Sequence, residues 1–176
     1  KIQTIELVAV NLYPFRQTVA KEGVTLDEAL ENIDIGGPTL IRAAGKNFPY
    51  VLVVVDPAEY EPLLEMLRRG SVPLEERRRL AQKAFQHVAS YDTAIAQYLW
   101  QGQGDFPPEM TIALHKQYDL RYGENPHQRA AFYIEERPGI KPGLTIGGAR
   151  LLSGREMSFN NILDLDSALT VVSAFS

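Results

Sequence analysis

Two short apolar runs, separated and followed by helix signals, constrain the fold of this chain more than any other feature. Residues 5–12 read IELVAVNL and residues 50–55 read YVLVVV, and both have the β-rich apolar character of buried strands. The stretches 25–28 and 56–59 each carry a capping residue followed three positions later by Glu, which predicts the start of a helix. Strands that alternate with helices are typical of an α/β fold with a mostly parallel sheet and helical crossovers.

Further helices are predicted from their ends and from their apolar spacing. The stretch 36–38, Gly-Gly-Pro, begins a helix that continues to Ala44, and Gly70 ends another. From Pro73 to about Trp100 apolar residues recur at helical spacing, which predicts one long packed helix. The residues of this stripe are Ala81, Ala84, Phe85, Val88, Ile95 and Leu99.

A change in composition after this helix predicts a boundary between two domains. Residues 102–110, GQGDFPPEM, are rich in glycine and proline and have the character of a linker. Beyond them the pattern predicts two strands and then a helix over residues 161–175. We therefore expect residues 1–105 to belong to one domain, and residues 106–176 to comprise a linker and the start of a second domain.

The composition excludes several classes of protein. With 176 residues, 45% of them hydrophobic and 23% charged, the chain resembles a soluble globular protein. A net charge of -4 argues against nonspecific binding to nucleic acid or anionic membranes. The absence of cysteine excludes disulfides and is compatible with a reducing cytoplasm, where we expect the protein to be. The three histidines lack the spacing of a metal site, so we predict no bound metal.

The first candidate site lies where the first strand ends, in VNLYPF, residues 10–15. Ligands of open α/β sheets bind beyond the carboxyl ends of the strands, which favours a functional role for Asn11 and Tyr13. Alternatively, Tyr13 packs against Pro14 and Phe15 to close the core. The residues alone leave both interpretations open.

The second candidate is IDIGGPTLIRAAGKN, residues 33–47. Asp34 can cap a helix, and the glycines after it allow a ligand to approach backbone N–H groups. Lys46 can simply complement the carbonyl end of its helix. The segment that contains Lys46 also leads directly into the strand at residues 50–55, so Lys46 lies close to the sheet. A partly desolvated lysine has a lowered pKa and can act as a base near neutral pH.

The third candidate is DLRYGENPHQ, residues 119–128, in which several donors emerge from one tight loop. The guanidinium of Arg121 is suited to phosphate or carboxylate, and Tyr122 follows it directly. An ordinary polar loop is the alternative interpretation.

These stretches together resemble one family, the bifunctional purine-biosynthesis enzyme AICAR transformylase/IMP cyclohydrolase. The resemblance rests, in chain order, on VNLYPF, ENIDIGGPTLIRAAGKN, SYDTAIAQYL, LRYGENPHQ and LSGREMSFNNILDLDSAL. It implies that residues 1–105 are the later part of a methylglyoxal-synthase-like cyclohydrolase domain. Residues 106–176 would include the start of a cytidine-deaminase-like α/β transformylase domain. The family's phosphate-binding segment is expected before Lys1.

The resemblance also implies which residues carry the cyclohydrolase reaction. Tyr13, Asp34 and Lys46 match the catalytic Tyr, Asp and Lys of the family's motifs. The reaction closes the formamide of FAICAR onto the neighbouring carboxamide, giving IMP and water without a cofactor. A lysine that holds and returns a proton, an acid that orients the amide and a phenol that hydrogen-bonds the changing oxygen suit this chemistry. The residues expected to line the IMP pocket are Val10, Asn11, Asp34, Ile35 and Gly36.

For the transformylase reaction, the resemblance implies that Arg121 and Tyr122 contact AICAR and that 10-formyltetrahydrofolate is the co-substrate. The family's catalytic Lys-His pair and its folate-binding residues are expected further along the chain, and the family implies a homodimer.

Two alternative interpretations assign the chain to another class of protein. A stand-alone methylglyoxal-synthase-like enzyme or regulatory ligand-binding domain would lack the RYGENPHQ region, and a pure assembly module would need no polar pocket around Tyr13, Asp34 and Lys46.

Overall fold

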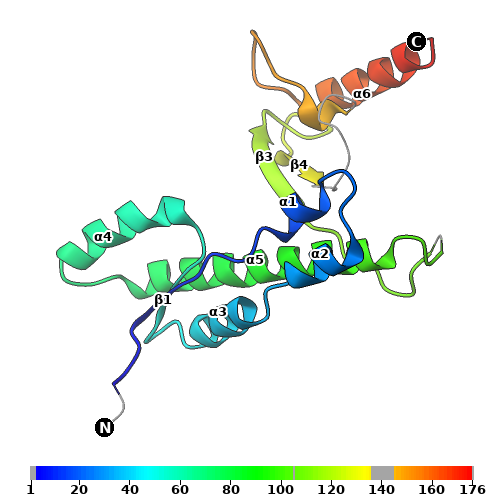
Figure 1. The fold of residues 1–176 in the computed structure, drawn as a ribbon. Coiled ribbons are helices and arrows are strands. Elements are labelled where there is room, and N and C mark those ends of the chain that lie inside the picture. Colours follow the sequence, from blue (N-terminus) through cyan, green and yellow to red (C-terminus); the bar gives the residue numbers. More distant parts are fainter. Residues whose placement is uncertain (1–2, 105, 136–144, 176) are drawn as a thin grey trace. The chain divides into compact units, whose positions relative to one another are not determined.

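Two compact units, Lys1–Thr111 and Ile112–Ser176, make up the chain. The computed structural model describes residues 3–104, 106–135 and 145–175. Figure 1 shows the order of the helices and strands along the chain. That these two units belong to two different catalytic domains stays a prediction.

The first unit contains a parallel pair of strands, β1 (Leu7–Ala9) and β2 (Leu52–Val54). Leu7 pairs with Leu52 and Ala9 pairs with Val54, so the two strands run in register along their whole length. The connection between them carries three helices, α1 (Phe15–Val19), α2 (Leu26–Glu31) and α3 (Gly36–Lys46). The predicted α/β fold with a parallel sheet and helical crossovers is confirmed.

The helix ends follow the local signals in the sequence. Thr25 and Glu28 form the predicted capping box, in which the Glu28 N–H donates to the Thr25 hydroxyl and the Glu28 carboxylate accepts from the Thr25 N–H. Asp56 accepts from the Ala58 N–H at 2.9 Å and caps a 3-10 turn, η1 (Pro57–Glu59). The next helix, α4 (Tyr60–Arg68), is followed by Gly70 with a φ of 107°, a conformation that favours glycine.

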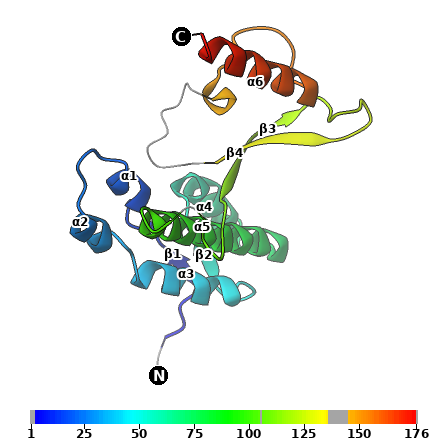
Figure 2. The ribbon, with the colours of Figure 1, turned by 90° about the vertical axis from the view of Figure 1, so that its right-hand side faces the viewer.

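All residues of β2 are buried. Because successive side chains of a strand point to opposite sides of the sheet, both faces of β2 are therefore covered. Figure 2 shows α3 on one side of the two strands and α4 on the other. The cluster formed with α3 and the long helix α5 (Leu74–Trp100) contains Ile41, Ala44, Val53, Val55, Ala81, Ala84 and Val88. The cluster formed with α4 contains Leu52, Val54, Leu63, Val72 and Leu80.

The prediction of a buried strand over residues 5–12 is wrong in its extent and in its burial. β1 spans only three residues, and Leu7 and Ile5 are 42% and 69% exposed. Within the described residues β2 is the only strand paired with β1, so little of β1 is covered. The β-rich run at residues 5–12 therefore contains a strand that is paired on one side, whereas the prediction of a buried strand assumed partners on both sides.

The long helix α5 packs against different partners along its length. Its first half contacts β2, whereas Tyr91 and Ala94 in its second half form a cluster with Phe15 of α1 and Ala29 of α2. The buried face therefore differs from the predicted stripe: Leu80, Tyr91, Thr93 and Ala94 are buried as well, and Phe85 and Leu99 are 38% and 43% exposed.

The described residues of the second unit include an antiparallel pair of strands and a helix. β3 (Leu114–Leu120) pairs with β4 (Ala130–Glu135), with an irregularity between Lys116 and Tyr118. A 3-10 turn, η2 (Ile146–Gly148), precedes α6 (Phe159–Ser173), which begins with a capping box of Ser158 and Asn161. Within the described parts of the chain, no helix is long and apolar enough to span a membrane.

The core around β2 yields a stability prediction. Ile41 is 1% exposed and fills the space between α3, β2 and α5, so Ile41→Ala should reduce the free energy of unfolding by about 2–5 kcal/mol. Urea denaturation followed by circular dichroism measures this loss. Leu40→Ala is the matched control on the same helix, because Leu40 is 55% exposed and its truncation should change stability by less than about 0.5 kcal/mol. Equal losses from both variants would contradict the described core.

Candidate functional site

The centre of the candidate site is the Asp34 carboxylate, which lies in the short segment between α2 and α3. Its Oδ1 accepts a hydrogen bond from the Gly37 N–H at 2.7 Å, and its Oδ2 accepts one from the Tyr13 N–H at 3.4 Å. Asp34 and Gly37 are three positions apart in the sequence, whereas Asp34 and Tyr13 are 21 positions apart. The structure therefore brings two of the predicted catalytic residues together, with the Asp34 carboxylate in contact with the backbone of Tyr13.

The end of β1 determines where Tyr13 lies. The Val10 N–H donates to the Val54 carbonyl at 3.0 Å and extends the strand pairing by one residue. Asn11 follows, and its side-chain amide donates to the Tyr60 hydroxyl at 3.4 Å. Val10, Asn11 and Tyr13 thus lie at the carboxyl end of β1, the edge of a parallel sheet at which ligands bind. The Tyr13 side chain is 56% exposed, which disfavours the alternative that it closes the core.

Gly37 allows the Asp34 carboxylate to lie against the first turn of α3. A Cβ atom at position 37 would meet Leu12 Cδ2 at 2.5 Å and both carboxylate oxygens of Asp34 at 2.8 Å. At Gly36 a Cβ atom would meet nothing within 4 Å. The sequence suggested that both glycines admit a ligand, whereas the structure gives Gly37 the more specific role of accommodating Asp34 and Leu12.

The other residues predicted to line the nucleotide pocket lie at the same helix end. Ile35 precedes α3 as its N-terminal flanking residue and is 75% exposed, and Gly36 is the first residue of the helix. Backbone N–H groups in the first turn of a helix carry the positive end of its dipole and attract negative charge. This helix end could therefore interact with an oxygen that gains negative charge.

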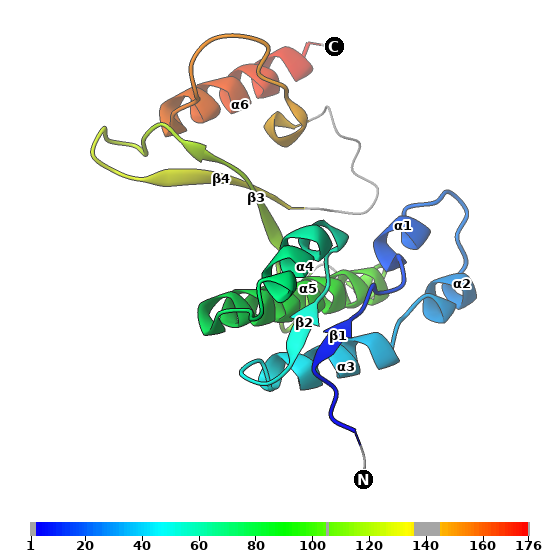
Figure 3. The same ribbon diagram turned by 90° about the vertical axis from the view of Figure 1, so that its left-hand side faces the viewer.

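Lys46 is not brought close to Tyr13 and Asp34. It is the exposed last residue of α3, and a helix of this length places its two ends about 15 Å apart. Figure 3 shows α3 next to the two strands, running from its connection with α2 to its connection with β2. Lys46 therefore lies towards the amino end of β2, whereas Tyr13 follows the carboxyl end of β1. Its catalytic role stays a prediction.

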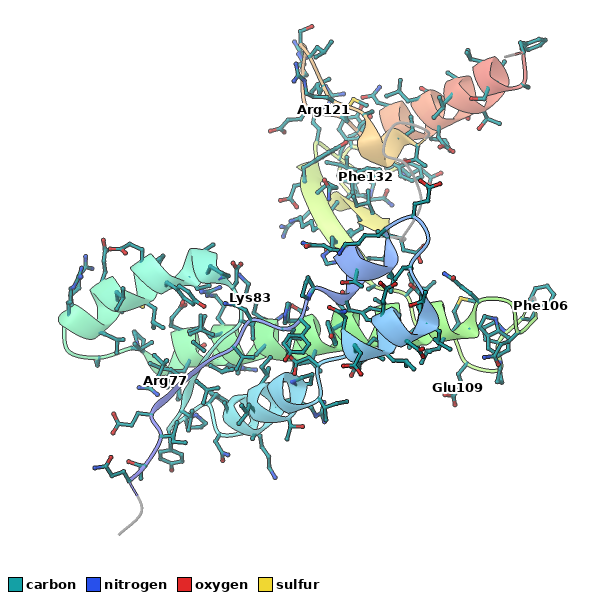
Figure 4. The ribbon with its side chains drawn as sticks, in the orientation of Figure 1. Arg77, Lys83, Phe106, Glu109, Arg121 and Phe132 are labelled. Carbon is teal, nitrogen blue, oxygen red and sulfur yellow. The ribbon has the colours of Figure 1, made fainter. Side chains whose placement is uncertain are left out.

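A network of ion pairs, which the sequence did not reveal, lies after the carboxyl end of β2. Lys83 donates to Asp56 Oδ2 at 2.6 Å and to Glu59 Oε1 at 2.7 Å. Arg79, one helical turn earlier on α5, contacts Glu59 and Glu76, each at 2.6 Å. Figure 4 labels Lys83, which lies on α5. The hydrogen bonds from Arg79 and Lys83 lower the pKa of Glu59 to about 2.

His87 lies one turn beyond Lys83 on α5 and is partly buried. Burial lowers the pKa of its imidazole, an effect that the negative charge of Asp56 partly opposes. Lys83 is ion-paired with Asp56 and with Glu59, so His87 borders an ion-paired cluster.

In the second unit, Arg121 and Tyr122 lie together at the end of β3. The Arg121 guanidinium is 4.9 Å from the centre of the Tyr122 ring and donates to the Tyr122 hydroxyl at 3.2 Å. Hydrogen bonds from Ser158 and Arg121 lower the pKa of the Tyr122 phenol. Figure 4 shows Arg121 in this unit, and the guanidinium is exposed. The two residues predicted to bind AICAR are therefore neighbours in contact.

Backbone hydrogen bonds hold the loop that carries these residues. The Arg121 N–H donates to the Met157 carbonyl at 2.8 Å, and the Phe159 N–H donates to the Tyr122 carbonyl at 3.1 Å. The Gly123 N–H donates to the Gln128 carbonyl at 2.9 Å, which closes the loop on itself. The loop is thus fixed both internally and against the start of α6.

Comparisons with known proteins identify the family. The family model described as AICARFT/IMPCHase bienzyme matches residues 44–176, and the model described as MGS-like domain matches residues 1–39. The chain belongs to the AICARFT/IMPCHase bienzyme family. The match to this family extends through the second unit, which supports the bifunctional interpretation over a stand-alone methylglyoxal-synthase-like protein.

Relatives in the AICARFT/IMPCHase bienzyme family are similar over the whole chain. The bifunctional purine biosynthesis protein PurH of Anoxybacillus flavithermus is 53% identical over 99% of this chain and 34% of its own length. PurH of Bacillus subtilis is 51% identical over the same shares of the two chains. The chain thus spans about a third of the length of these curated relatives. A solved structure titled "Crystal structure of ForH" is 34% identical over 54% of this chain and 50% of that chain, with a TM-score of 0.45.

The two glycines that begin α3 give a matched pair of variants. Gly37→Ala should reduce the free energy of unfolding by about 1–3 kcal/mol, because its methyl group would displace Leu12 or the Asp34 carboxylate. Gly36→Ala meets no neighbour and should leave stability unchanged or raise it by up to about 1 kcal/mol. Thermal and urea denaturation of both variants measure the difference. Equal stability of the two variants would show that Asp34 does not lie against Gly37.

The ion-pair network makes stability depend on pH. The pKa of Glu59 is about 2 in the folded chain, against an ordinary value of 4.5. The ionised carboxylate therefore stabilises the folded state above pH 4.5, and this contribution is lost as the pH falls from 4.5 towards 2. The difference in unfolding free energy between the original chain and Glu59→Gln should decrease over this range.

Glu61→Gln is the control for this pH dependence. Glu61 forms an exposed pair with Arg68 at 3.9 Å, with side chains that are 74% and 71% exposed, so its removal should leave the pH dependence almost unchanged. Urea denaturation at intervals between pH 2 and pH 6 measures both differences. A stability difference for Glu59→Gln that does not vary with pH would exclude the network.

Proposed function

We propose that this chain forms the later part of the cyclohydrolase domain and the start of the transformylase domain of a bifunctional enzyme of purine biosynthesis. Such an enzyme transfers a formyl group from 10-formyltetrahydrofolate to AICAR and then closes the product, FAICAR, to IMP. Membership of the AICARFT/IMPCHase bienzyme family and the PurH relatives support this proposal. The contact between Asp34 and Tyr13 at the carboxyl end of β1 is the structural observation that carries it.

The ring closure depends mainly on the transfer of protons, and neither reacting group has to be activated by a covalent modification. The carboxamide nitrogen of FAICAR attacks the formyl carbon, a C–N bond forms, and the nitrogen loses a proton. The formyl oxygen takes up that proton and becomes a hydroxyl. The formamide nitrogen then loses its own proton as a C=N double bond forms, the C–O bond breaks, and the hydroxyl leaves with this second proton as water. Because both reacting groups belong to one molecule, a site that holds them at the right geometry supplies much of the rate enhancement.

Asp34 would orient the carboxamide. Its Oδ1 is engaged by the Gly37 N–H at 2.7 Å, whereas among the described residues its Oδ2 receives only the long 3.4 Å contact from the Tyr13 N–H. Oδ2 can therefore accept a hydrogen bond from a carboxamide N–H of the substrate. This bond would hold the amide towards the formyl carbon and would stabilise the positive charge that the attacking nitrogen develops.

Tyr13 and the first turn of α3 would act on the formyl oxygen. The exposed Tyr13 phenol can donate to that oxygen as negative charge develops on it. The backbone N–H groups at Ile35 and Gly36 add the positive end of the helix dipole. Val10 and Asn11 would complete the nucleotide pocket from the end of β1.

Lys46 is proposed as the group that holds and returns the proton. Lys46 lies at the other end of α3 from Asp34. A group that transfers a proton must come within hydrogen-bonding reach of the reacting atom, directly or through one water, so this role requires Lys46 to approach the reacting atoms more closely than the described α3 places it. A variant at this position therefore tests the assignment directly.

Arg121 and Tyr122 are proposed to bind AICAR for the formyl transfer. In this reaction the amine of AICAR attacks the formyl carbon of the folate and loses a proton, the bond between the formyl carbon and the folate nitrogen breaks, and that nitrogen takes up a proton as tetrahydrofolate leaves. An exposed guanidinium stacked on a phenol is suited to the phosphate or carboxamide of such a nucleotide. The homodimer and the cytoplasmic location expected from the resemblance belong to the same proposal.

The test uses a full-length protein that contains this chain, supplied with FAICAR and no folate. The original protein should form IMP, measured by absorbance and chromatography. Asp34→Asn and Lys46→Ala should each reduce kcat for this step by about 100-fold, since general acid–base and orienting groups contribute at least that much. Formyl transfer to AICAR, assayed separately, should stay within about 2-fold because it uses different residues.

Asp27→Asn is the matched control, because Asp27 is an exposed residue of α2 and its loss should leave both activities unchanged. Equal loss of both activities in Asp34→Asn would indicate a folding defect and not a catalytic role. Normal cyclisation by Lys46→Ala would exclude Lys46 and restrict the site to Tyr13 and Asp34. Absence of IMP formation by the original protein would overturn the proposed function.

A further inference from the structure

The hydroxyl of Tyr91 connects α5 to the segment that carries Asp34. It accepts a hydrogen bond from the Asp34 N–H at 3.0 Å and donates one to the Asn32 carbonyl at 3.0 Å. Tyr91 follows Asn32 by 59 residues along the chain, and its side chain is 7% exposed. One buried phenol thus engages the backbone on both sides of Ile33.

The ring of Tyr91 is itself held in place. It packs edge-on against Phe15, with the ring centres 6.2 Å apart and an angle of 64° between the ring planes. Phe15 is 1% exposed and lies two residues after Tyr13. Tyr91 therefore contacts both stretches of the candidate site, one through its hydroxyl and the other through its ring.

The Tyr91 hydroxyl adds a tertiary contact to the segment from Asn32 to Ile35. The other hydrogen bonds of this segment include one from the Ile33 N–H to the Leu30 carbonyl at 3.0 Å and one from the Gly37 N–H to Asp34 Oδ1 at 2.7 Å. Asn32 ends α2 and Ile35 flanks the start of α3, where Ile35 provides no side-chain cap. Burial raises the pKa of the Tyr91 phenol, so the hydroxyl keeps the proton that it donates to the Asn32 carbonyl. Without it, two backbone groups would lose their partner and the segment could shift.

We propose that Tyr91 is a positioning residue for the cyclisation: its hydroxyl fixes the backbone from Asn32 to Asp34, so that the Asp34 carboxylate faces Tyr13. The effect on catalysis rests on the proposed function, whereas the effect on the backbone does not. A shift of the Asp34 backbone would move Oδ2 away from the substrate amide without removing any group that touches it. Misplacement of this kind reduces the rate of the chemical step more than the binding of the substrate.

Tyr91→Phe is the informative variant, since it removes the hydroxyl and keeps the ring that packs on Phe15. Tyr98→Phe is the matched control. Tyr98 lies on the same helix and also packs edge-on against Phe15 at 5.7 Å, but its hydroxyl makes no hydrogen bond to any residue that the structure describes. Both variants are made in the full-length protein.

Hydrogen exchange resolved to single residues tests the backbone effect. In the original protein the Asp34 amide should exchange at least about 10-fold more slowly than the exposed Ile35 amide, because the Tyr91 hydroxyl protects it. Tyr91→Phe should remove most of this protection, and Tyr98→Phe should retain it. Fast exchange of Asp34 in the original protein, or unchanged protection in Tyr91→Phe, would overturn the inference.

Steady-state kinetics with FAICAR test the catalytic effect. Tyr91→Phe should reduce kcat about 10-fold and change KM less than about 3-fold, whereas formyl transfer should be unaffected. Equal loss of both activities, or normal kcat, would show that Tyr91 has only a structural role and would overturn the inference. If the original protein does not form IMP, the proposed function fails, and the exchange of the Asp34 amide still decides whether Tyr91 positions this segment.

Discussion

The burial of β2 on both faces is the constraint on which the first unit depends. Val53 and Val54 are each 1% exposed although they point to opposite sides of the sheet. Helices must therefore cover both faces, and α3, α4 and α5 provide this cover. α3 precedes β2, and η1 separates β2 from α4, so the packing of both helices on β2 also limits the position of the segments that flank them. The segment before α3 carries Asp34, and the loop after β2 carries Asp56.

The helix α5 contacts both the segment that carries Asp34 and the loop that carries Asp56. Lys83, His87 and Tyr91 are spaced by four residues on α5, so they lie on one face of the helix in successive turns. Lys83 binds the Asp56 carboxylate, and Tyr91 binds the backbone at Asp34. The core thus positions polar groups indirectly: apolar side chains of α5 pack on β2, and neighbouring polar side chains of the same helix fix the loops. A change in the packing of α5 would therefore shift both loops together.

The sequence predicted the features that depend on neighbouring residues. The capping box of Thr25 and Glu28 forms within three positions, so composition and spacing are enough to recognise it. Contacts between distant residues are different. The Asp34 N–H and the Tyr91 hydroxyl are 57 positions apart, and no local pattern distinguishes Tyr91 from a core aromatic residue. The exposure of Phe85 and of β1 was likewise not predictable, because it depends on which elements pack on each face. Lys46 illustrates the same limit, since its proximity to β2 in sequence does not place it near Asp34.

The second unit positions its candidate residues by another means. None of its described hydrophobic side chains belongs to the buried core, whereas the polar Ser158 is 1% exposed. Backbone hydrogen bonds, from Arg121 to Met157 and from Phe159 to Tyr122, join the loop after β3 to the residues that begin α6. Ser158 lies between these two bonds and also caps α6. The geometry of Arg121 and Tyr122 therefore depends on the capping of one helix, and loss of the Ser158 hydroxyl would disturb the helix end and the loop together.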